Sequence, residues 1–463
     1  MKKQLTLMPL VGLIYFTVSG GAFGLEDLVA SCGPGLAMLL LIVTPLLWSV
    51  PTALVTAELG AMLPLEGGYY RWVYFGLGRQ WGFMEGWWTW LYTFVDMAIY
   101  PVLFTAYLKA FLGFFFPGMG EWPWWVRWLI CLCVIGSSLL INLTGAKSVG
   151  RSAVIAFGVV TLPFLILAAL GLPLMSHSPV QPFAAGDGPG LMATMGTGLT
   201  AVMWSYMGWD NVSTYAGEVD NPGRNFPLAM LIAVALVTLL YLVPIGVTLS
   251  LTTNWAEWHS ENFTIADVAG KAIGRWLGIL LSFAVMWSLW SMFNSQLLYT
   301  SRLPFTMAED GLLPHFITKS HPRWDSPYVS LILCSVIYSV FSLLSFQKLV
   351  VINVVIYSTA LTLEYVALVL LRWRRPDLHR PFRIPGGWFG VILAFASMLA
   401  FAITAVIFTI TGADESWKQL VIVAVLLASG PLIYYARTAL RPEPDPIVPW
   451  VRALTPGLSP AGD

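Results

Sequence analysis

The sequence predicts an all-α integral membrane protein with twelve transmembrane helices. Of the 463 residues, 57% are hydrophobic and only 10% are charged, whereas soluble domains carry about 25% charged residues. Apolar stretches of about 20 residues recur along the chain, and each is long enough to cross the ~30 Å hydrocarbon core as a helix. These observations exclude a soluble globular domain and a disordered chain.

The twelve predicted spans share this length and a largely apolar composition. They occupy approximately residues 7–32, 35–61, 80–113, 123–143, 151–173, 191–216, 227–251, 272–300, 327–345, 348–371, 388–411 and 417–438. The first span follows Met1-Lys2-Lys3 but has no small-residue cleavage site, so we expect a helix of the mature protein rather than a signal peptide. The Pro-rich segment 441–463 has no helical pattern and is predicted to be a mobile tail.

The distribution of basic residues predicts the orientation. With the N-terminus inside, 18 of the 24 Lys and Arg residues lie in the loops and tails on the cytoplasmic side. Cytoplasmic loops carry an excess of Lys and Arg in membrane proteins. We therefore expect a multi-pass protein of the cell membrane with both termini in the cytoplasm. The long outer loop 252–271 carries Trp255, Trp258 and His259, which could anchor it at the interface or form a lid.

Two of the spans are interrupted near mid-membrane. The first contains Ser19-Gly20-Gly21-Ala22-Phe23-Gly24, and the sixth contains Ser205-Tyr206-Met207-Gly208-Trp209-Asp210. Glycine costs about 1 kcal/mol relative to alanine inside a helix, and unwound backbone at this depth must line protein or a water-filled cavity. Paired interruptions are typical of the substrate site of inverted-repeat transporters. Close helix packing by small residues is the alternative.

The motifs at and beyond these breaks resemble the amino acid–polyamine–organocation transporter superfamily, and most closely its polyamine-uptake branch. The resemblance covers roughly residues 6 to 390. It rests on Val18 to Asp27, Ala57-Glu58-Leu59-Gly60, Gly67-Gly68-Tyr69, Tyr100-Pro101-Val102-Leu103, Trp209 to Pro222, Ala308 to Pro314 and Arg380-Pro381-Phe382-Arg383-Ile384-Pro385.

The resemblance implies a leucine-transporter-type fold that works by alternating access. This fold has a five-plus-five inverted repeat, broken helices 1 and 6, and two extra C-terminal helices. We expect one transmembrane domain over residues 1–440, with repeats at about 6–173 and 191–371 and extra helices at about 388–438. It also implies that the first break offers N–H groups to a carboxylate, and the second break offers carbonyls to an ammonium group beside an aromatic gate.

Five acidic residues of the predicted spans are candidates for a functional role, because an unpaired carboxylate there costs about 2.5–3.5 kcal/mol. They are Glu26, Asp27, Asp96, Asp210 and Glu364. No Lys or Arg lies at the same depth, so the excess negative charge favours a cationic substrate. Each acid also has a structural alternative. Glu26, Asp27 and Asp210 could cap resumed helices, Asp96 could bond to a neighbouring helix, and Glu364 could pair with Arg372 or Arg374.

The candidate substrate-binding residues combine the two breaks with these acids and aromatic side chains, whose faces attract organic ammonium ions. They are Ser19, Gly20, Gly21, Gly24, Glu26, Asp27, Asp96, Ser205, Tyr206, Trp209 and Asp210. The sequence therefore predicts a secondary transporter of small organic cations, most closely polyamines. A transporter or exchanger of cationic or neutral amino acids is the alternative, and a transporter-like nutrient sensor is a more remote one.

The coupling ion is predicted to be H⁺, with Na⁺ as the alternative. Glu26 or Asp27 could carry the proton, whereas Ser291, Asn294 and Ser295 of the eighth span could complete a sodium site or simply bond helices together. In the superfamily a lysine in the fifth span often stands in for sodium, and the segment 152–173 contains none.

Other classes lack their sequence signatures. The five His residues lie in predicted loops without metal-ligand spacing, and no Gly-rich phosphate loop occurs, so an enzyme, a bound metal and an organic cofactor are not expected. The four Cys lie in apolar runs and are predicted core residues. Zero net charge without a basic stripe excludes a nucleic-acid binder. The expected partners are the lipid bilayer and a small cation or amino acid; the oligomeric state is not predicted.

Overall fold

The computed structural model describes residues 6–440, apart from residues 66, 117, 145, 187–188, 214–218, 259–263, 325, 345 and 413–415. The predicted tail, 441–463, and His259 of the outer loop lie outside these residues. All elements of the described chain are helices, as the composition predicts.

The α-helices of this part of the chain begin and end as follows: α1 Leu7–Val18, α2 Glu26–Cys32, α3 Pro34–Thr44, α4 Val50–Met62, α5 Gly68–Leu77, α6 Arg79–Gly113, α7 Trp124–Leu143, α8 Ala146–Gly171, α9 Pro189–Ser205, α10 Pro222–Leu251, α11 Ile265–Ala272, α12 Arg275–Thr300, α13 Arg302–Glu309, α14 Tyr328–Phe341, α15 Phe346–Arg374, α16 Gly387–Gly412 and α17 Ser416–Leu440. Short helical turns add η1 Pro45–Ser49, η2 Leu172–Leu174, η4 Trp255–Glu257 and η5 His315–Thr318.

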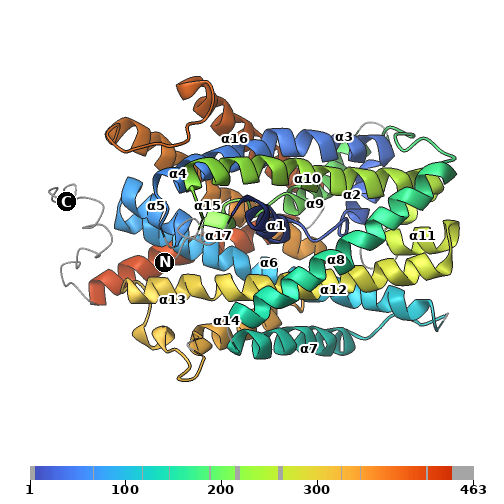
Figure 1. The fold of residues 1–463 in the computed structure, drawn as a ribbon, viewed down its shortest axis with the longest axis horizontal. Coiled ribbons are helices and arrows are strands. Elements are labelled where there is room, and N and C mark those ends of the chain that lie inside the picture. The colour runs from blue at the N-terminus through green and yellow to red at the C-terminus, as the bar shows by residue number, and fades with distance from the viewer. Residues whose placement is uncertain are drawn as a thin grey trace.

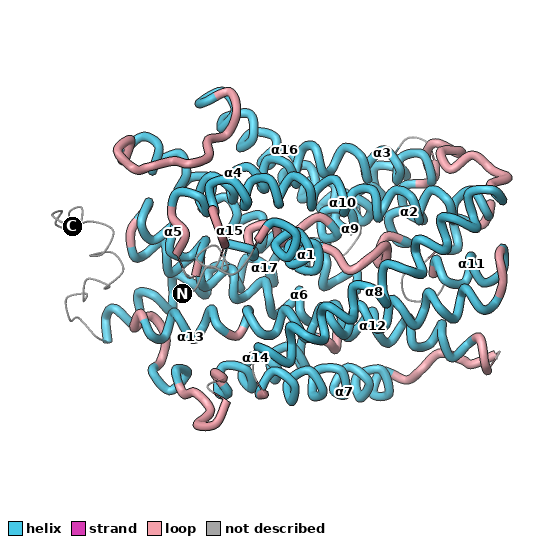
Figure 2. Tube along the Cα trace, in the orientation of Figure 1, coloured by secondary structure: helices cyan, strands magenta, loops and turns pink. Residues whose placement is uncertain are grey.

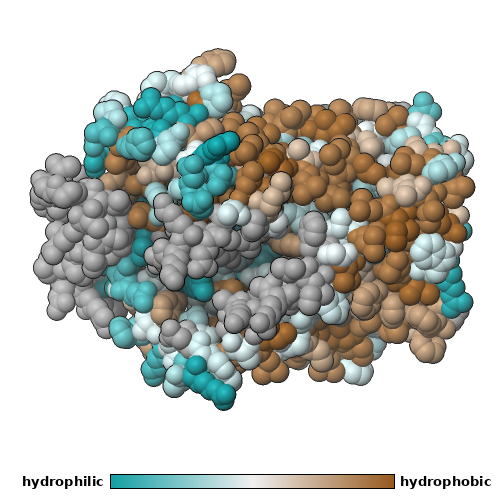
Figure 3. Space-filling view, viewed as in Figure 1, coloured by the Kyte–Doolittle hydropathy of each residue, from teal (hydrophilic) through white to brown (hydrophobic). Residues whose placement is uncertain are grey.

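Most long helices run side by side along the longest dimension of the molecule, and α1 is seen nearly end-on in the middle (Figure 1). Helices α5 and α13 lie at one end of this bundle, and α11 lies at the other (Figure 2). Apolar side chains dominate the half of the visible face toward α8 and α11, while hydrophilic ones gather toward the α5 and α13 end (Figure 3). An apolar surface of this kind is the surface that a bilayer requires.

Eight helices of the described residues are long and apolar enough to cross a membrane, which establishes a multi-pass protein. Helix α6 is the most enclosed of them, with 78% of its apolar window buried, whereas α17 has 11% buried. A helix that is apolar on all sides and surrounded by others belongs to the core. The centre of the bundle is therefore built around α6, and α17 lies at its edge.

The twelve predicted stretches all contain helix, but several are not simple spans. The predicted span 35–61 is divided by the π-helical turn η1, which begins at Pro45, because proline has no N–H to donate to the helix. The first and sixth stretches are broken at the predicted glycine-rich segments. Helices α5, α11 and α13 form in segments predicted as loops, and α11 starts with a capping box of Thr264 and Asp267.

Candidate substrate-binding site

The first break separates α1 from α2 over residues 19–25. Gly21 and Gly24 have φ angles of 125° and 73°, a region that glycine enters without strain. Gly20 is required for a different reason, because a Cβ there would lie 2.3 Å from Sδ of Met292. Its carbonyl accepts a hydrogen bond of 2.6 Å from Oγ of Ser288. A backbone carbonyl that would be hydrogen-bonded within a continuous helix thus bonds to α12 instead and holds the break against that helix.

The second break follows the end of α9 at Ser205. Residues 206–210 are not helical, and residues 211–213 form a single 3-10 turn. Gly208 has a φ of 90°, and its N–H donates to the hydroxyl of Tyr357, 3.2 Å away. The carbonyl of Ser205 accepts a hydrogen bond from the hydroxyl of Tyr241 at 2.8 Å. The sixth stretch therefore breaks where its sequence predicts.

A small cavity lies between the two breaks, with a volume of about 20 Å³. It is lined by Thr17, Val18, Ser19, Gly20, Phe23, Tyr92, Asp96, Tyr100, Trp204, Ser205, Met207, Gly208, Asn211, Tyr241 and Met292. A volume of this size holds about one water molecule. Both breaks thus face one site, and in this conformation the site has no room for an organic substrate.

Asp96 is the one charged side chain among these described lining residues. Its Oδ1 accepts hydrogen bonds from Nε1 of Trp204 at 3.1 Å and from Nδ2 of Asn353 at 2.9 Å. Its Oδ2 accepts one from the hydroxyl of Tyr100 at 3.2 Å, and Gln296 donates to that hydroxyl at 2.8 Å. Side chains of α6, α9, α12 and α15 therefore hold this carboxylate in place.

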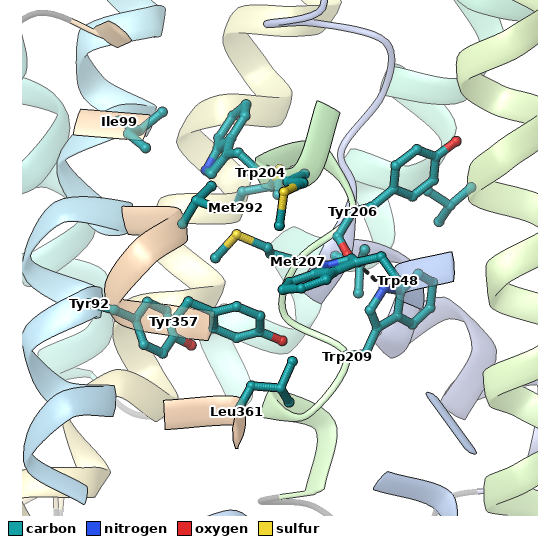
Figure 4. Close-up of a cluster of buried hydrophobic side chains, with 14 of the residues drawn as sticks. Trp48, Tyr92, Ile99, Trp204, Tyr206, Met207, Trp209, Met292, Tyr357 and Leu361 are labelled. Atoms are coloured by element: carbon teal, nitrogen blue, oxygen red, sulfur yellow. Dashed lines mark hydrogen bonds between the residues drawn. The ribbon is translucent and has the colours of Figure 1, made fainter. Parts of the chain in front are cut away.

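No ion pair involving Asp96 occurs in the described part of the chain. The hydrogen bonds from these donors favour the charged form of the carboxylate, and none of the donors carries a charge that would neutralise it. Aromatic rings surround it as well, with the centroids of Tyr100 and Trp204 6.3 Å apart. Figure 4 shows Trp204 and Met292 together at one side of the break, while Tyr92 and Tyr357 lie against each other. The site combines one fixed anion with aromatic and thioether surface.

The sequence profile of the amino acid permease family matches residues 5–430. The chain belongs to this family. The match confirms the predicted family and the predicted class, a membrane transporter rather than an enzyme.

Several curated relatives are similar to this permease over most of its length. Polyamine transporter PUT1 of Oryza sativa subsp. japonica is 33% identical over 462 residues, which cover 99% of this chain and 84% of that protein. Polyamine transporter RMV1 of Arabidopsis thaliana is 36% identical over 396 residues, covering 84% and 78%. The aspartate-proton symporter of Bacillus subtilis (strain 168) is 27% identical over 470 residues, covering 96% and 85%.

Four of the predicted substrate residues of this permease line the cavity, namely Ser19, Gly20, Asp96 and Ser205. Gly21 and Gly24 shape the first break but are not among the lining residues. The other five predicted residues are not among the lining residues either. The functional assignment of all eleven stays a prediction.

The predicted aromatic residues of the second break point away from the cavity. The hydroxyl of Tyr206 donates to the carbonyl of Leu41 at 3.0 Å, and Nε1 of Trp209 donates to the carbonyl of Tyr206 at 2.8 Å. Both side chains are fully buried. Trp204, two residues earlier on α9, is the aromatic residue of this segment that lines the cavity and contacts Asp96.

Glu26 and Asp27 lie in the first turn of α2 and are buried, in line with the capping alternative. Oε1 of Glu26 also accepts hydrogen bonds from the hydroxyl of Tyr107 at 2.5 Å and from the N–H of Ile265 at 3.4 Å. Ile265 is the first residue of α11. Glu26 therefore connects α2 to α6 and to the outer-loop helix α11 rather than to the cavity.

Asp210 is the last residue of the second break and accepts a hydrogen bond from Tyr357. It is not among the lining residues of the cavity, whereas its neighbour Asn211 is. The expected pairing of Glu364 with Arg372 or Arg374 is wrong, because Arg372 binds Glu58 and neither oxygen of Glu364 has a hydrogen-bond donor. Glu58 is fully buried and accepts further hydrogen bonds from Arg372 Nε at 2.7 Å and from the N–H of Ile384 at 2.8 Å.

The coupling-ion candidates on α12 have different surroundings. Oγ of Ser291 is buried without a hydrogen-bond partner, whereas Oδ1 of Asn294 accepts a hydrogen bond of 2.9 Å from Asn142 of α7. Ser295 is only partly buried. No group of three His, Cys, Asp or Glu residues suited to a metal ion occurs in the described residues. The Asn142 contact is the interhelical bonding that we gave as the alternative to a sodium site.

Sequence reasoning missed the partners of Asp96, which are Trp204, Asn353, Tyr100 and Gln296. It also missed Glu85, a fully buried acid of α6. The signal that could have identified them is their polarity. Asn353, Gln296 and Glu85 lie in apolar stretches, where a polar side chain costs free energy in the membrane. Their shared neighbourhood was not visible, because it joins helices far apart in the sequence.

Proposed function

We propose that this permease is a secondary active transporter of small organic cations, most closely di- and polyamines. The observation that carries the proposal is Asp96, a carboxylate held by three donors between the two helix breaks with no ion pair in the described chain. An ammonium group supplies the missing positive charge, and the rings of Tyr100 and Trp204 add cation–π attraction of about 0.5–2 kcal/mol each. The relatives named polyamine transporters support this substrate class.

Alternating access completes the proposal, with a five-plus-five repeat of ten spans and two further C-terminal spans in one domain over residues 1–440. The small volume of the cavity supports a cycle in which the breaks separate to admit substrate and close again. The basic-residue bias supports a cell-membrane protein with both termini in the cytoplasm. We propose H⁺ as the coupling ion.

Amino acid transport is the second candidate. The relative named aspartate-proton symporter supports it. The unwound backbone at residues 19–25 also supports it, because its N–H groups can donate hydrogen bonds to a substrate carboxylate. Such a substrate would bring its own negative charge close to Asp96, whereas a polyamine has only positive charges. The chemistry of the cavity therefore favours the amine.

Substrate counterflow in proteoliposomes tests the proposal. Vesicles loaded with unlabelled putrescine, spermidine, arginine or leucine are diluted into traces of the same labelled compound. We expect labelled amines to accumulate transiently. Accumulation of leucine or arginine alone would establish the amino acid candidate, and the absence of counterflow with all four would contradict a carrier of either class.

A further inference from the structure

A second group of acids lies outside the cavity. It consists of Glu85 on α6, Asp210 after the α9 break and Glu364 on α15, which we call the acidic triad. Their side chains are 0%, 2% and 0% exposed. Tyr357 of α15 donates a hydrogen bond to Asp210 and packs against Tyr92 of α6, so the part of α15 that carries Glu364 runs beside Asp210 and beside the part of α6 that carries Glu85. Glu364 interacts electrostatically with both acids. Segments of α6 and α15 and the second break thus bring three carboxyl groups into one buried region.

The acidic triad has too few partners for three negative charges. Oε1 of Glu85 accepts a hydrogen bond from Thr89 at 3.1 Å, and Oδ1 of Asp210 accepts one from Tyr357. Oε2 of Glu85 and both oxygens of Glu364 receive none. Among the described residues, no Lys or Arg forms an ion pair with any of the three.

The groups that face the triad are not cations either. From α6 they include Tyr92, and from α15 Tyr357 and Tyr365. Arg372, two turns beyond Glu364 on α15, is bound to Glu58. A buried carboxylate without a counter-charge takes up a proton instead of staying ionised. Because both oxygens of Glu364 are buried without a donor and none of these neighbours supplies a counter-charge, we expect the acidic triad to hold at least one proton.

Two members of the triad, Glu85 and Glu364, are separate from the carboxylate of the cavity. Asp96 and Glu85 are eleven residues apart on α6, and Asn353, which binds Asp96, is eleven residues from Glu364 on α15. At 1.5 Å per residue, both helices give a separation of about 16 Å. Asp210 and Tyr357 lie between the two levels, and Tyr357 contacts both Asp210 and the N–H of Gly208 in the break. The break is thus connected to the triad by one side chain.

We propose that Glu85, Asp210 and Glu364 form the proton site of this transporter, with Glu364 as the residue that gains and loses the proton. This inference rests on the proposed function, and it places the coupling ion apart from the substrate at Asp96. The proton binds a carboxylate oxygen of Glu364 and is shared with Asp210; its release leaves the carboxylate. Movement of the second break changes the hydrogen bond between Tyr357 and Asp210. This change alters the proton affinity of Asp210 and Glu364.

The test uses full-length protein with Glu364→Gln in proteoliposomes. Glutamine has the shape of a protonated glutamate, so we expect putrescine counterflow without a pH gradient to stay within about twofold of wild type. We expect the variant to lose uphill putrescine accumulation driven by a pH gradient, and to lose the putrescine-evoked pH change seen with a trapped pH dye. Glu121→Gln is the matched control, because Glu121 is an exposed acid that pairs with Lys109 at the surface.

Each result decides the inference. A Glu364→Gln variant that still accumulates putrescine and moves protons would overturn it, as would loss of counterflow in a variant that still unfolds at the wild-type temperature. If this variant does not fold, Glu85→Gln carries the same test with the same expected loss. If the wild-type protein shows putrescine counterflow without an evoked pH change, or requires sodium for transport, the proton site is wrong but the proposed amine transport is not contradicted. If the wild-type protein shows no counterflow, the proposed function itself is contradicted.

Discussion

Nε1 of Trp204 lies 3.1 Å from Oδ1 of Asp96 and donates a hydrogen bond to it. Trp204 is in the last turn of α9, directly before the second break, while Asp96 is in the long central helix α6. One side chain therefore links the acid of the cavity to the end of the broken helix. Any movement of the break that displaces Trp204 changes the environment of Asp96.

Replacing Asp96 with asparagine is predicted to weaken amine transport strongly. Hydrogen bonds to charged groups contribute about 1.5–3 kcal/mol, so we expect initial rates of putrescine uptake at low concentration to fall about 10- to 100-fold. Asp377→Asn is the control, because Asp377 is an exposed acid that pairs with Arg375. Rates equal to wild type in Asp96→Asn would contradict charge recognition in this cavity.

Trp204→Phe is predicted to have a smaller effect. An aromatic ring remains and two donors still bind Asp96, so we expect a loss of at most about 1.5 kcal/mol, the lower end of the range for hydrogen bonds to charged groups. The concentration of putrescine for half-maximal counterflow is expected to rise about two- to tenfold. Trp290→Phe is a matched control, since Nε1 of Trp290 donates to Ser137 of α7 at 3.0 Å, away from the cavity. An equal change in both variants would show that Trp204 has no special relation to Asp96.

Gly20→Ala is predicted to abolish or severely reduce transport. The added Cβ would lie 2.3 Å from Sδ of Met292 and 2.4 Å from Oγ of Ser288, so the first break would have to move away from α12. Overpacking of this kind costs about 1–3 kcal/mol. Gly12→Ala in α1 has no atom within 4 Å of its Cβ and serves as the control. Counterflow measures both variants, and wild-type activity of Gly20→Ala would show that the break is not tightly packed.

Glu58→Gln is predicted to destabilise the protein. Glu58 is buried and binds Arg372, with Arg380 3.9 Å away and the N–H of Ile384 at 2.8 Å. Removing one partner of a buried ion pair costs about 3–5 kcal/mol, so the thermal unfolding midpoint in detergent should fall clearly. Asp377→Asn, which breaks an exposed pair, should leave it nearly unchanged. A midpoint that stays at the wild-type value in Glu58→Gln would show that this pair contributes no net stability.

The positions of the two breaks could be predicted from the sequence because their causes are local. Gly21, Gly24 and Gly208 adopt positive φ angles at the segments where glycines cluster in apolar stretches. The acids could also be found, since a carboxyl group in a membrane span is rare and costly. Their roles could not be separated in this way. Asp96 faces the cavity, Glu26 contacts α11, and Asp210 accepts a hydrogen bond from Tyr357.

The sequence by itself determined that this is a helical membrane protein with interrupted first and sixth spans, because span length, hydropathy and glycine content act over neighbouring residues. Only the tertiary structure decided which side chains meet. Asn353 reaches Asp96 across 257 positions of the chain, and Arg372 binds Glu58 rather than Glu364. The helices bring these groups together by packing their apolar faces against one another. The periodicity of one helix shows which face is apolar but does not specify which helix packs against it.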